Sequence, residues 1–104
     1  MKDDKYRCGD FLTQMREGNY SSPTVCKEKY SLEHFLSYME KAHVERIQDV
    51  TEDDVEKYRA ALMDSKYAPS TARGYLGTVR MFFAYLEKEG IVFLNPAENV
   101  PLLL

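Results

Sequence analysis

Apolar residues recur at steps of three and four between positions 75 and 86, the spacing of one face of an α-helix. These residues are Tyr75, Leu76, Val79, Phe82, Phe83 and Leu86. Pro69 precedes them, and Ser70 or Thr71 can cap the first turn by accepting backbone N–H bonds. Gly90 follows the last apolar position and Pro96 comes soon after, an arrangement that ends helices. The pattern therefore predicts one long helix that begins near Pro69 and ends just before Gly90.

Three earlier segments also have helical spacing, and no convincing strand pattern occurs. Residues 9–17 predict a short helix that ends at a glycine. The next helix starts with Ser22 as N-cap and Pro23 at its first position, and runs to about Ala42. Thr51 caps a third helix, whose first turn carries acids that suit a helix N-terminus. The expected core residues before the long helix are Val25, Leu32, Phe35, Leu36, Met39, Ile47, Val50, Val55, Tyr58 and Leu62. The chain is predicted to be all-α.

The 104 residues, 44% of them apolar, suit one domain with a modest core. We expect residues 1–8 to be a flexible lead-in and residues 9–100 to form the domain. The apolar tail at 101–104 is either folded back on the helices or the start of a linker to a further domain. No run approaches the roughly 20 apolar residues that cross a bilayer, and no secretory segment follows Met1. A cytoplasmic protein without a membrane partner is therefore predicted.

Charge is distributed unevenly along the chain. The net charge is −3, which argues against a strongly basic nucleic-acid binder. From residue 65 to residue 86, however, there is no Asp or Glu. On the long helix, the face opposite the apolar stripe carries Ser70, Arg73, Gly74, Gly77 and Arg80. Because the local field decides which partner is attracted, this basic, glycine-thinned face is predicted to meet a polyanion.

Motifs for catalysis, metals or cofactors are missing from the sequence. His34, His43, Cys8 and Cys26 do not have zinc-finger spacing, and the two cysteines are predicted to be small, at least half-buried thiols. There is no glycine-rich phosphate loop and no local signature of a nucleophilic triad. We therefore expect no metal, no cofactor and no enzymatic activity within these residues.

Several motifs together resemble one family. They are S-P-T at 22–24, V-T-E-D-D-V-E-K-Y at 50–58, S-T-A-R-G-Y-L-G-T-V-R-M-F-F-A-Y-L at 70–86, and N-P-A-E-N-V at 95–100. The chain is similar, over about residues 10–100, to the N-terminal core-binding domain of tyrosine recombinases and phage integrases. The resemblance implies a SAM-like orthogonal bundle of four main helices. It also implies a non-catalytic clamp on the duplex of a recombination site. The implied partners are double-stranded DNA, a catalytic domain of the same parent chain, and neighbouring recombinase protomers in a tetramer.

In that family the second and fourth helices approach the major groove. Arg73 and Arg80 are two turns apart, about 10 Å along the helix axis, a reach suited to one groove wall. Gly77 would admit the DNA backbone, although close helix packing explains Gly74 and Gly77 equally well. The predicted DNA-binding residues are Thr24, Lys27, Lys66, Ser70, Thr71, Arg73, Gly77 and Arg80.

One position departs from the family, because Glu28 stands where many members carry a tyrosine. A carboxylate facing DNA would repel phosphate, so the second helix is a less secure contact than the fourth. With the acidic total charge, this departure also leaves open a second interpretation, a helical protein-interaction module that does not bind nucleic acid.

Overall fold

The computed structural model describes the backbone of residues 4–18 and 22–100, and the side chains of residues 11–18 and 23–100. The described part contains four α-helices, α1 (Asp4–Glu17), α2 (Ser22–Lys41), α3 (Glu52–Asp64) and α4 (Pro69–Lys88), and the 3₁₀ turn η1 (Ile47–Asp49). It contains no strand, which confirms the predicted all-α class. Residues 1–3 of the predicted lead-in, the loop at 19–21 and the tail at 101–104 lie outside the described residues, whereas residues 4–8 of the lead-in belong to α1.

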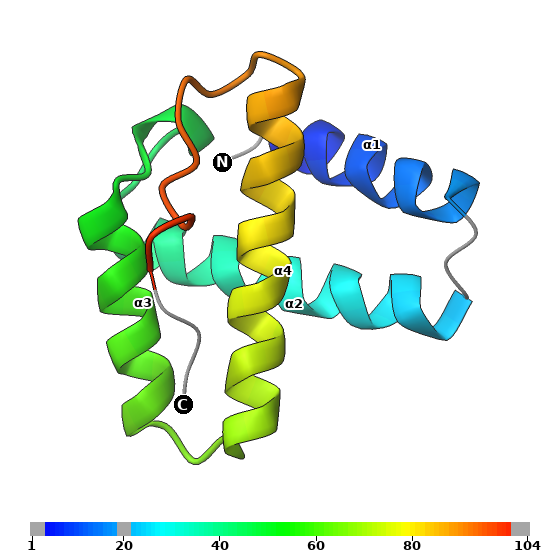
Figure 1. Ribbon diagram of the computed structural model, residues 1–104. Coiled ribbons are helices and arrows are strands. Elements are labelled where there is room, and N and C mark those ends of the chain that lie inside the picture. The colour runs from blue at the N-terminus through cyan, green and yellow to red at the C-terminus, as the bar shows by residue number, and fades with distance from the viewer. Residues whose placement is uncertain (1–3, 19–21, 101–104) are drawn as a thin grey trace.

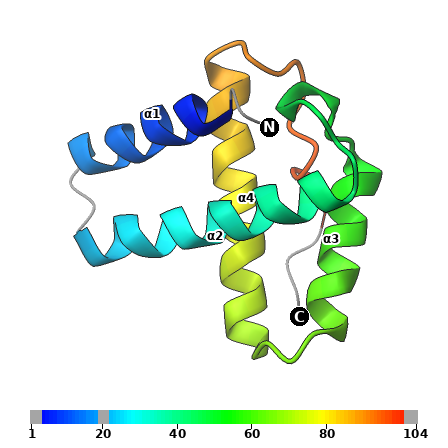
Figure 2. The ribbon, with the colours of Figure 1, turned by 180° about the vertical axis from the view of Figure 1, so that it is seen from behind.

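The helices form two crossed pairs. α1 and α2 run side by side, and together they cross α4 at a steep angle (Figures 1 and 2). α3 lies along α4, and the segment after α4 returns between these two helices (Figure 1). This arrangement is the orthogonal four-helix bundle that the resemblance implies, and it turns one face of α4 toward α2.

The core follows the predicted apolar stripes. Phe35 on α2 and Phe83 on α4 are fully buried, with ring centroids 5.9 Å apart in an edge-to-face arrangement. The other predicted core residues are buried, apart from Leu36 and Tyr75, which are partly buried against the core. The core also takes in Phe11, Met15, Ala72, Val92, Ala97 and Val100. Sequence spacing therefore identified the inner face of every long helix.

Two predicted helix starts were wrong. α4 is not capped by Ser70 or Thr71; its N-cap is Ala68, which has no side chain able to accept the first-turn amides. A residue before proline avoids the helical region, so Ala68 is extended, with φ −62° and ψ 148°, and Pro69 becomes the first helical residue. α1 starts at Asp4 rather than Gly9, because a glycine lowers helix stability by only about 1 kcal/mol and does not block the helix.

The ends of α2 and α4 share one geometry. Gly90 has φ 75°, and the amides of Gly90 and Ile91 bond to the carbonyls of Glu87 and Leu86, which is a Schellman motif. The predicted end of α4 is thus confirmed. α2 ends in the same way at His43, whose φ is 64°. That left-handed histidine was not anticipated, since glycine is the usual residue there.

In the described part of the chain, no helix is long and apolar enough to cross a membrane.

Candidate nucleic-acid interface

The first turns of α2 and α4 enclose an open groove of about 520 Å³. The residues that line this α2–α4 groove are Pro23, Cys26, Lys27, Tyr30, Ser31, Ser70, Thr71, Gly74 and Tyr75. Three predicted DNA-binding residues therefore meet at one place, although more than 40 positions separate Lys27 from Ser70 and Thr71 in sequence. The groove is a concave surface built from two helices rather than from one.

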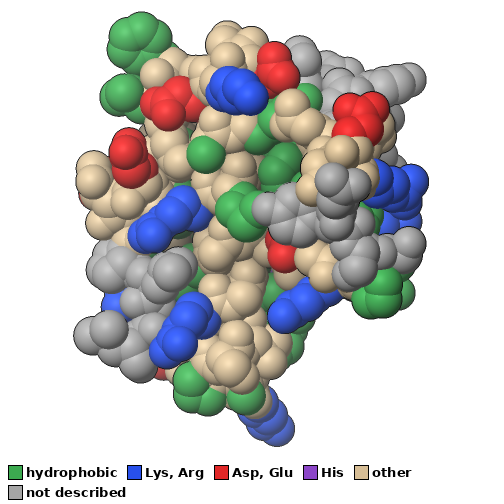
Figure 3. Space-filling model, turned by 45° about the vertical axis from the view of Figure 1, so that its right-hand side comes forward, with side chains coloured by type: hydrophobic (Ala, Val, Ile, Leu, Met, Phe, Trp, Pro, Cys, Tyr) green, Lys and Arg blue, Asp and Glu red, His purple; other side chains and the backbone are tan. Residues whose placement is uncertain are grey.

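The start of α4 gives the groove its electrostatic character. No side chain caps this helix end, and its first turn holds no acid. Helix N-termini carry partial positive charge and unsatisfied amides, which favour anions. In the described part of the chain, Lys27 and Lys66 form no ion pair. Figure 3 shows a strip of backbone and small polar side chains along α4, with Lys and Arg side chains on both flanks.

The glycines of α4 leave room over the helix. A Cβ at Gly74 would meet only the Lys27 Cε, at the ordinary contact distance of 4.0 Å. A Cβ at Gly77 would meet nothing within 4 Å. Close helix packing is therefore the wrong explanation for Gly77, because no part of the described chain lies close enough to exclude a side chain. As far as the described residues go, the space above Gly77 is open.

Glu28 bonds to α4 where α2 and α4 meet. From its sequence position it was a candidate to face DNA. Its carboxylate accepts a hydrogen bond from the Thr78 hydroxyl of α4, and Thr78 is only 2% exposed. The same hydroxyl lies 3.1 Å from the carbonyl oxygen of Gly74. The partly buried carboxylate thus bonds α2 to α4.

Arg73 and Arg80 differ in their surroundings. Arg73 is exposed, whereas Arg80 is half-buried and its Nη2 donates to the Val100 carbonyl at 2.8 Å. Asn95 donates from Nδ2 to the Arg80 carbonyl at 3.3 Å and accepts from the amide of Ala97 at 2.9 Å. Arg80 therefore holds the segment after α4 in place, so the two arginines are not an equivalent pair.

Two further predicted residues, Lys66 and Thr24, do not line the groove. Lys66 is exposed in the loop between α3 and α4, and Thr24 is half-buried in the first turn of α2. Cys26 is exposed, so the predicted burial of this thiol is wrong. The prediction failed because Cys26 follows the buried Val25 on the helix, so its side chain faces the groove rather than the core.

Tyr30 and Tyr75 also line the groove, and the sequence analysis did not include them in the site. A signal was present, because Tyr30 follows Lys27 by three positions and Tyr75 follows Thr71 by four, and such residues share a helix face. Tyr75 was instead assigned to the apolar stripe, whose edge it occupies.

The cations near α3 contrast with those of the groove. Arg46 pairs with Asp49 at 3.3 Å, and Lys57 pairs with Asp53 at 3.2 Å. Hydrogen bonds to these carboxylates raise the pKa of both cations above their ordinary values. These two cations near α3 are thus each offset by an acid.

The described part of the chain is thus an orthogonal bundle of α-helices with an open groove between α2 and α4. Residues 10–90 match the family described as phage integrase, N-terminal SAM-like domain. Because this match spans most of the sequence, the chain belongs to that family.

Relatives and a solved structure agree with this assignment. The chain is 32% identical over 84 residues to tyrosine recombinase XerC of Roseiflexus castenholzii, covering 81% of this chain and 27% of the relative. It is 29% identical over 96 residues to XerC of Halalkalibacterium halodurans, covering 92% and 32%. The crystal structure of the N-terminal domain of a phage integrase/site-specific recombinase from Haloarcula marismortui shares the fold, with TM-score 0.83 and 20% identity over 92% of this chain and 91% of the other. The chain spans about a third or less of the length of the relatives it matches.

Proposed function

We propose that this chain binds the duplex of a recombination site across the α2–α4 groove and the adjoining face of α4. The observation that carries the proposal is the meeting of Lys27 with the uncapped, acid-free start of α4 in one concave surface. Lysines, hydroxyls and helix N-termini are the usual donors to phosphate oxygens. Arg73, Thr24 and Lys66 extend the surface along the duplex, and the open space over Gly77 admits the DNA backbone.

The net charge of −3 is compatible with this role. Binding to a polyanion depends on the field at the contact surface rather than on the total charge. Many of the acids lie on or next to α3, where they cap the helix or pair with nearby cations. A duplex at the α2–α4 groove meets the start of α4, where acids are absent.

The chain acts as one half of a clamp and does no chemistry alone. The relatives are recombinases roughly three times as long, so a catalytic domain of the same parent chain is the expected first partner. Neighbouring recombinase protomers in a tetramer are the expected second partner. Isolated, the domain binds DNA weakly and with steep salt dependence, because few phosphates are contacted.

The test is a titration of labelled duplex by fluorescence anisotropy at several salt concentrations. A double variant, Lys27→Ala with Arg73→Ala, removes two cations from the proposed surface. We expect the slope of log affinity against log salt to shrink by about 2, one for each lost phosphate contact. Arg80→Ala is measured separately, since its loss also frees the Val100 carbonyl.

Lys57→Ala is the matched control, because Lys57 is an exposed lysine that pairs with Asp53 on α3. It should leave the slope unchanged. An equal loss of slope in control and double variant would reject the α2–α4 surface, and salt-insensitive binding would reject DNA binding itself.

A further inference from the structure

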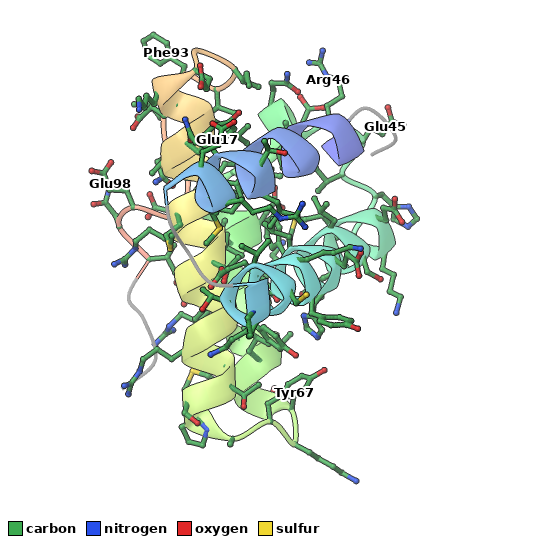
Figure 4. The ribbon with its side chains drawn as sticks, turned by 90° about the vertical axis from the view of Figure 1, so that its right-hand side faces the viewer. Glu17, Glu45, Arg46, Tyr67, Phe93 and Glu98 are labelled. Carbon is green, nitrogen blue, oxygen red and sulfur yellow. The ribbon has the colours of Figure 1, made fainter. Side chains whose placement is uncertain are left out.

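His34 joins three parts of the bundle through both of its ring nitrogens. From α2 its Nδ1 lies 2.7 Å from the Tyr58 hydroxyl of α3, and its Nε2 lies 3.0 Å from the Tyr67 hydroxyl. Tyr67 belongs to the loop that leads into α4 and lies at the end of the molecule opposite Phe93 (Figure 4). The single imidazole therefore links α2, α3 and the segment in front of α4.

The same ring also packs against Tyr75, a residue that lines the groove. His34 stacks on Tyr75 of α4 with ring centroids 4.5 Å apart and an interplanar angle of 19°. Tyr67 meets Tyr75 edge-on at 5.4 Å. Tyr75 lines the α2–α4 groove beside Thr71 and Gly74. The position of the first turns of α4 thus depends on the same cluster that holds His34.

The hydrogen bonds select one form of the histidine. Tyr58 is fully buried, and His34 is the partner that the described part of the structure gives its hydroxyl. Burial also raises the pKa of Tyr58, so this phenol keeps its proton. If Nδ1 accepts from Tyr58 and Nε2–H donates to Tyr67, both contacts are satisfied at once. The geometry therefore favours neutral His34 with its proton on Nε2.

Protonation of His34 would break this arrangement. In an imidazolium both nitrogens donate, so the buried Tyr58 hydroxyl would lose its acceptor. The charged and titratable groups around the ring are Lys41 on α2, Tyr58 on α3, Tyr67 in the loop and Tyr75 on α4. None of these is a carboxylate that would stabilise the cation.

The pKa of His34 is accordingly lowered from its ordinary value of 6.5, first by burial and then by Lys41. Above pH 6.5 the histidine is neutral in both the folded and the unfolded chain, and its contribution to stability is complete. As the pH falls below 6.5, the unfolded chain binds the proton first, so stability falls until the pH is below the folded pKa.

We propose that His34 is a positioning residue of the DNA interface: neutral, it holds Tyr67, Tyr75 and the start of α4 in the binding geometry, and protonation releases them. The proposal rests on the DNA-binding role argued above. If the proposal is right, the affinity for duplex DNA falls on acidification. Added positive charge on a DNA-binding protein would by itself raise that affinity.

The first test compares the wild-type domain with His34→Gln, which keeps one acceptor and one donor but does not titrate. Duplex affinity is measured from about pH 7.5 down to the lowest pH at which both proteins stay folded, because the pKa of His34 lies below the ordinary histidine value. We expect the wild type to lose about 5-fold more affinity than the variant, the size of one lost buried hydrogen bond. Equal pH dependence in the two proteins would overturn the proposal.

The second test needs no variant. Nitrogen-15 spectra of the wild-type histidines should show His34 with its proton on Nε2. By reciprocity, if protonation weakens DNA binding, then DNA binding must lower the pKa of His34. A pKa that rises when duplex is added would instead mean that bound duplex favours the protonated form of His34, and would overturn the positioning role.

Tyr38→Phe is the control for general damage to the cluster. The Tyr38 ring packs on Tyr58 with centroids 5.2 Å apart, and its hydroxyl donates to the Lys57 carbonyl oxygen at 3.4 Å rather than to His34. This variant should keep the wild-type affinity and pH profile. Failure of the wild type to bind duplex at about pH 7.5 would reject the DNA-binding role, whereas normal binding with a pH profile like that of His34→Gln would reject the present proposal alone.

Discussion

The N-termini of α3 and α4 differ sharply in how their amides are satisfied. At α3, the Thr51 hydroxyl accepts from the Asp54 amide at 3.2 Å, and the Asp54 carboxylate accepts from the Thr51 amide at 2.9 Å. Three acids occupy that first turn. At α4, the N-cap is Ala68, no side chain caps the helix, and the first turn has no acid. One helix end is closed by its own side chains, and the other is left open to an external anion.

The comparison shows that helix stability alone does not explain the sequence. A capping box and first-turn acids each stabilise a helix, and α4 has neither, although it is the central helix of the bundle (Figure 1). α4 can do without them because its stability comes from burial of its apolar face, where Phe82, Phe83 and Leu86 are fully buried. Its N-terminus is therefore free to serve binding.

The largest effect on DNA binding is expected when an acid is placed in the first turn of α4, as in the first turn of α3. Ser70→Asp puts an acid into the first turn of α4, where the helix dipole should leave the domain as stable or slightly more stable. Duplex affinity should nevertheless fall by about tenfold or more, which corresponds to 1.4 kcal/mol. Anisotropy titration and urea denaturation of the same protein measure the two effects. The reciprocal change Glu52→Ser on α3 is the control, with affinity unchanged; a Ser70→Asp variant that binds normally would break the comparison.

A second variant removes the side-chain cap at the N-terminus of α3. Thr51→Ala removes the capping hydroxyl of α3 and should lower the free energy of unfolding by about 1 kcal/mol. At temperatures where the variant is folded, DNA affinity should match that of the wild type, because Thr51 lies on the α3 side of the bundle. Urea unfolding followed by circular dichroism gives the stability. A loss of affinity in the folded variant would place α3 in the binding surface and contradict the contrast.

The smallest effect concerns the open space above α4. Gly77→Ala should raise the free energy of unfolding by up to about 1 kcal/mol, since alanine is the better helix former and its methyl group meets nothing within 4 Å. If the DNA backbone approaches closely, the same methyl group should weaken duplex binding by a few-fold. Ala84→Gly, at an exposed position of the same helix beyond the first turns, is the matched control. Unchanged binding by Gly77→Ala would remove Gly77 from the interface.

The candidate site was predictable only in part. Lys27, Ser70 and Thr71 were identified from their residue types and helix faces, and the fold brings them into one groove. The DNA contacts of all the predicted residues stay predictions. Arg80 was paired with Arg73 from their seven-residue spacing, yet Arg80 bonds to the Val100 carbonyl. Spacing along one helix cannot reveal that the chain returns 20 positions later to occupy that face.

The sequence by itself determined the features that depend on neighbours within one or two helical turns. These include the inner stripes, the Thr51 cap and the glycine end of α4, because backbone preferences and side-chain periodicity act over three or four residues.

The tertiary structure alone decided which distant groups meet. Glu28 bonds to Thr78, and His34 lies among Tyr58, Tyr67 and Tyr75. These contacts join residues between 24 and 50 positions apart. Their existence depends on how α2 crosses α4, and that crossing is fixed by the packing of the whole core rather than by any local pattern.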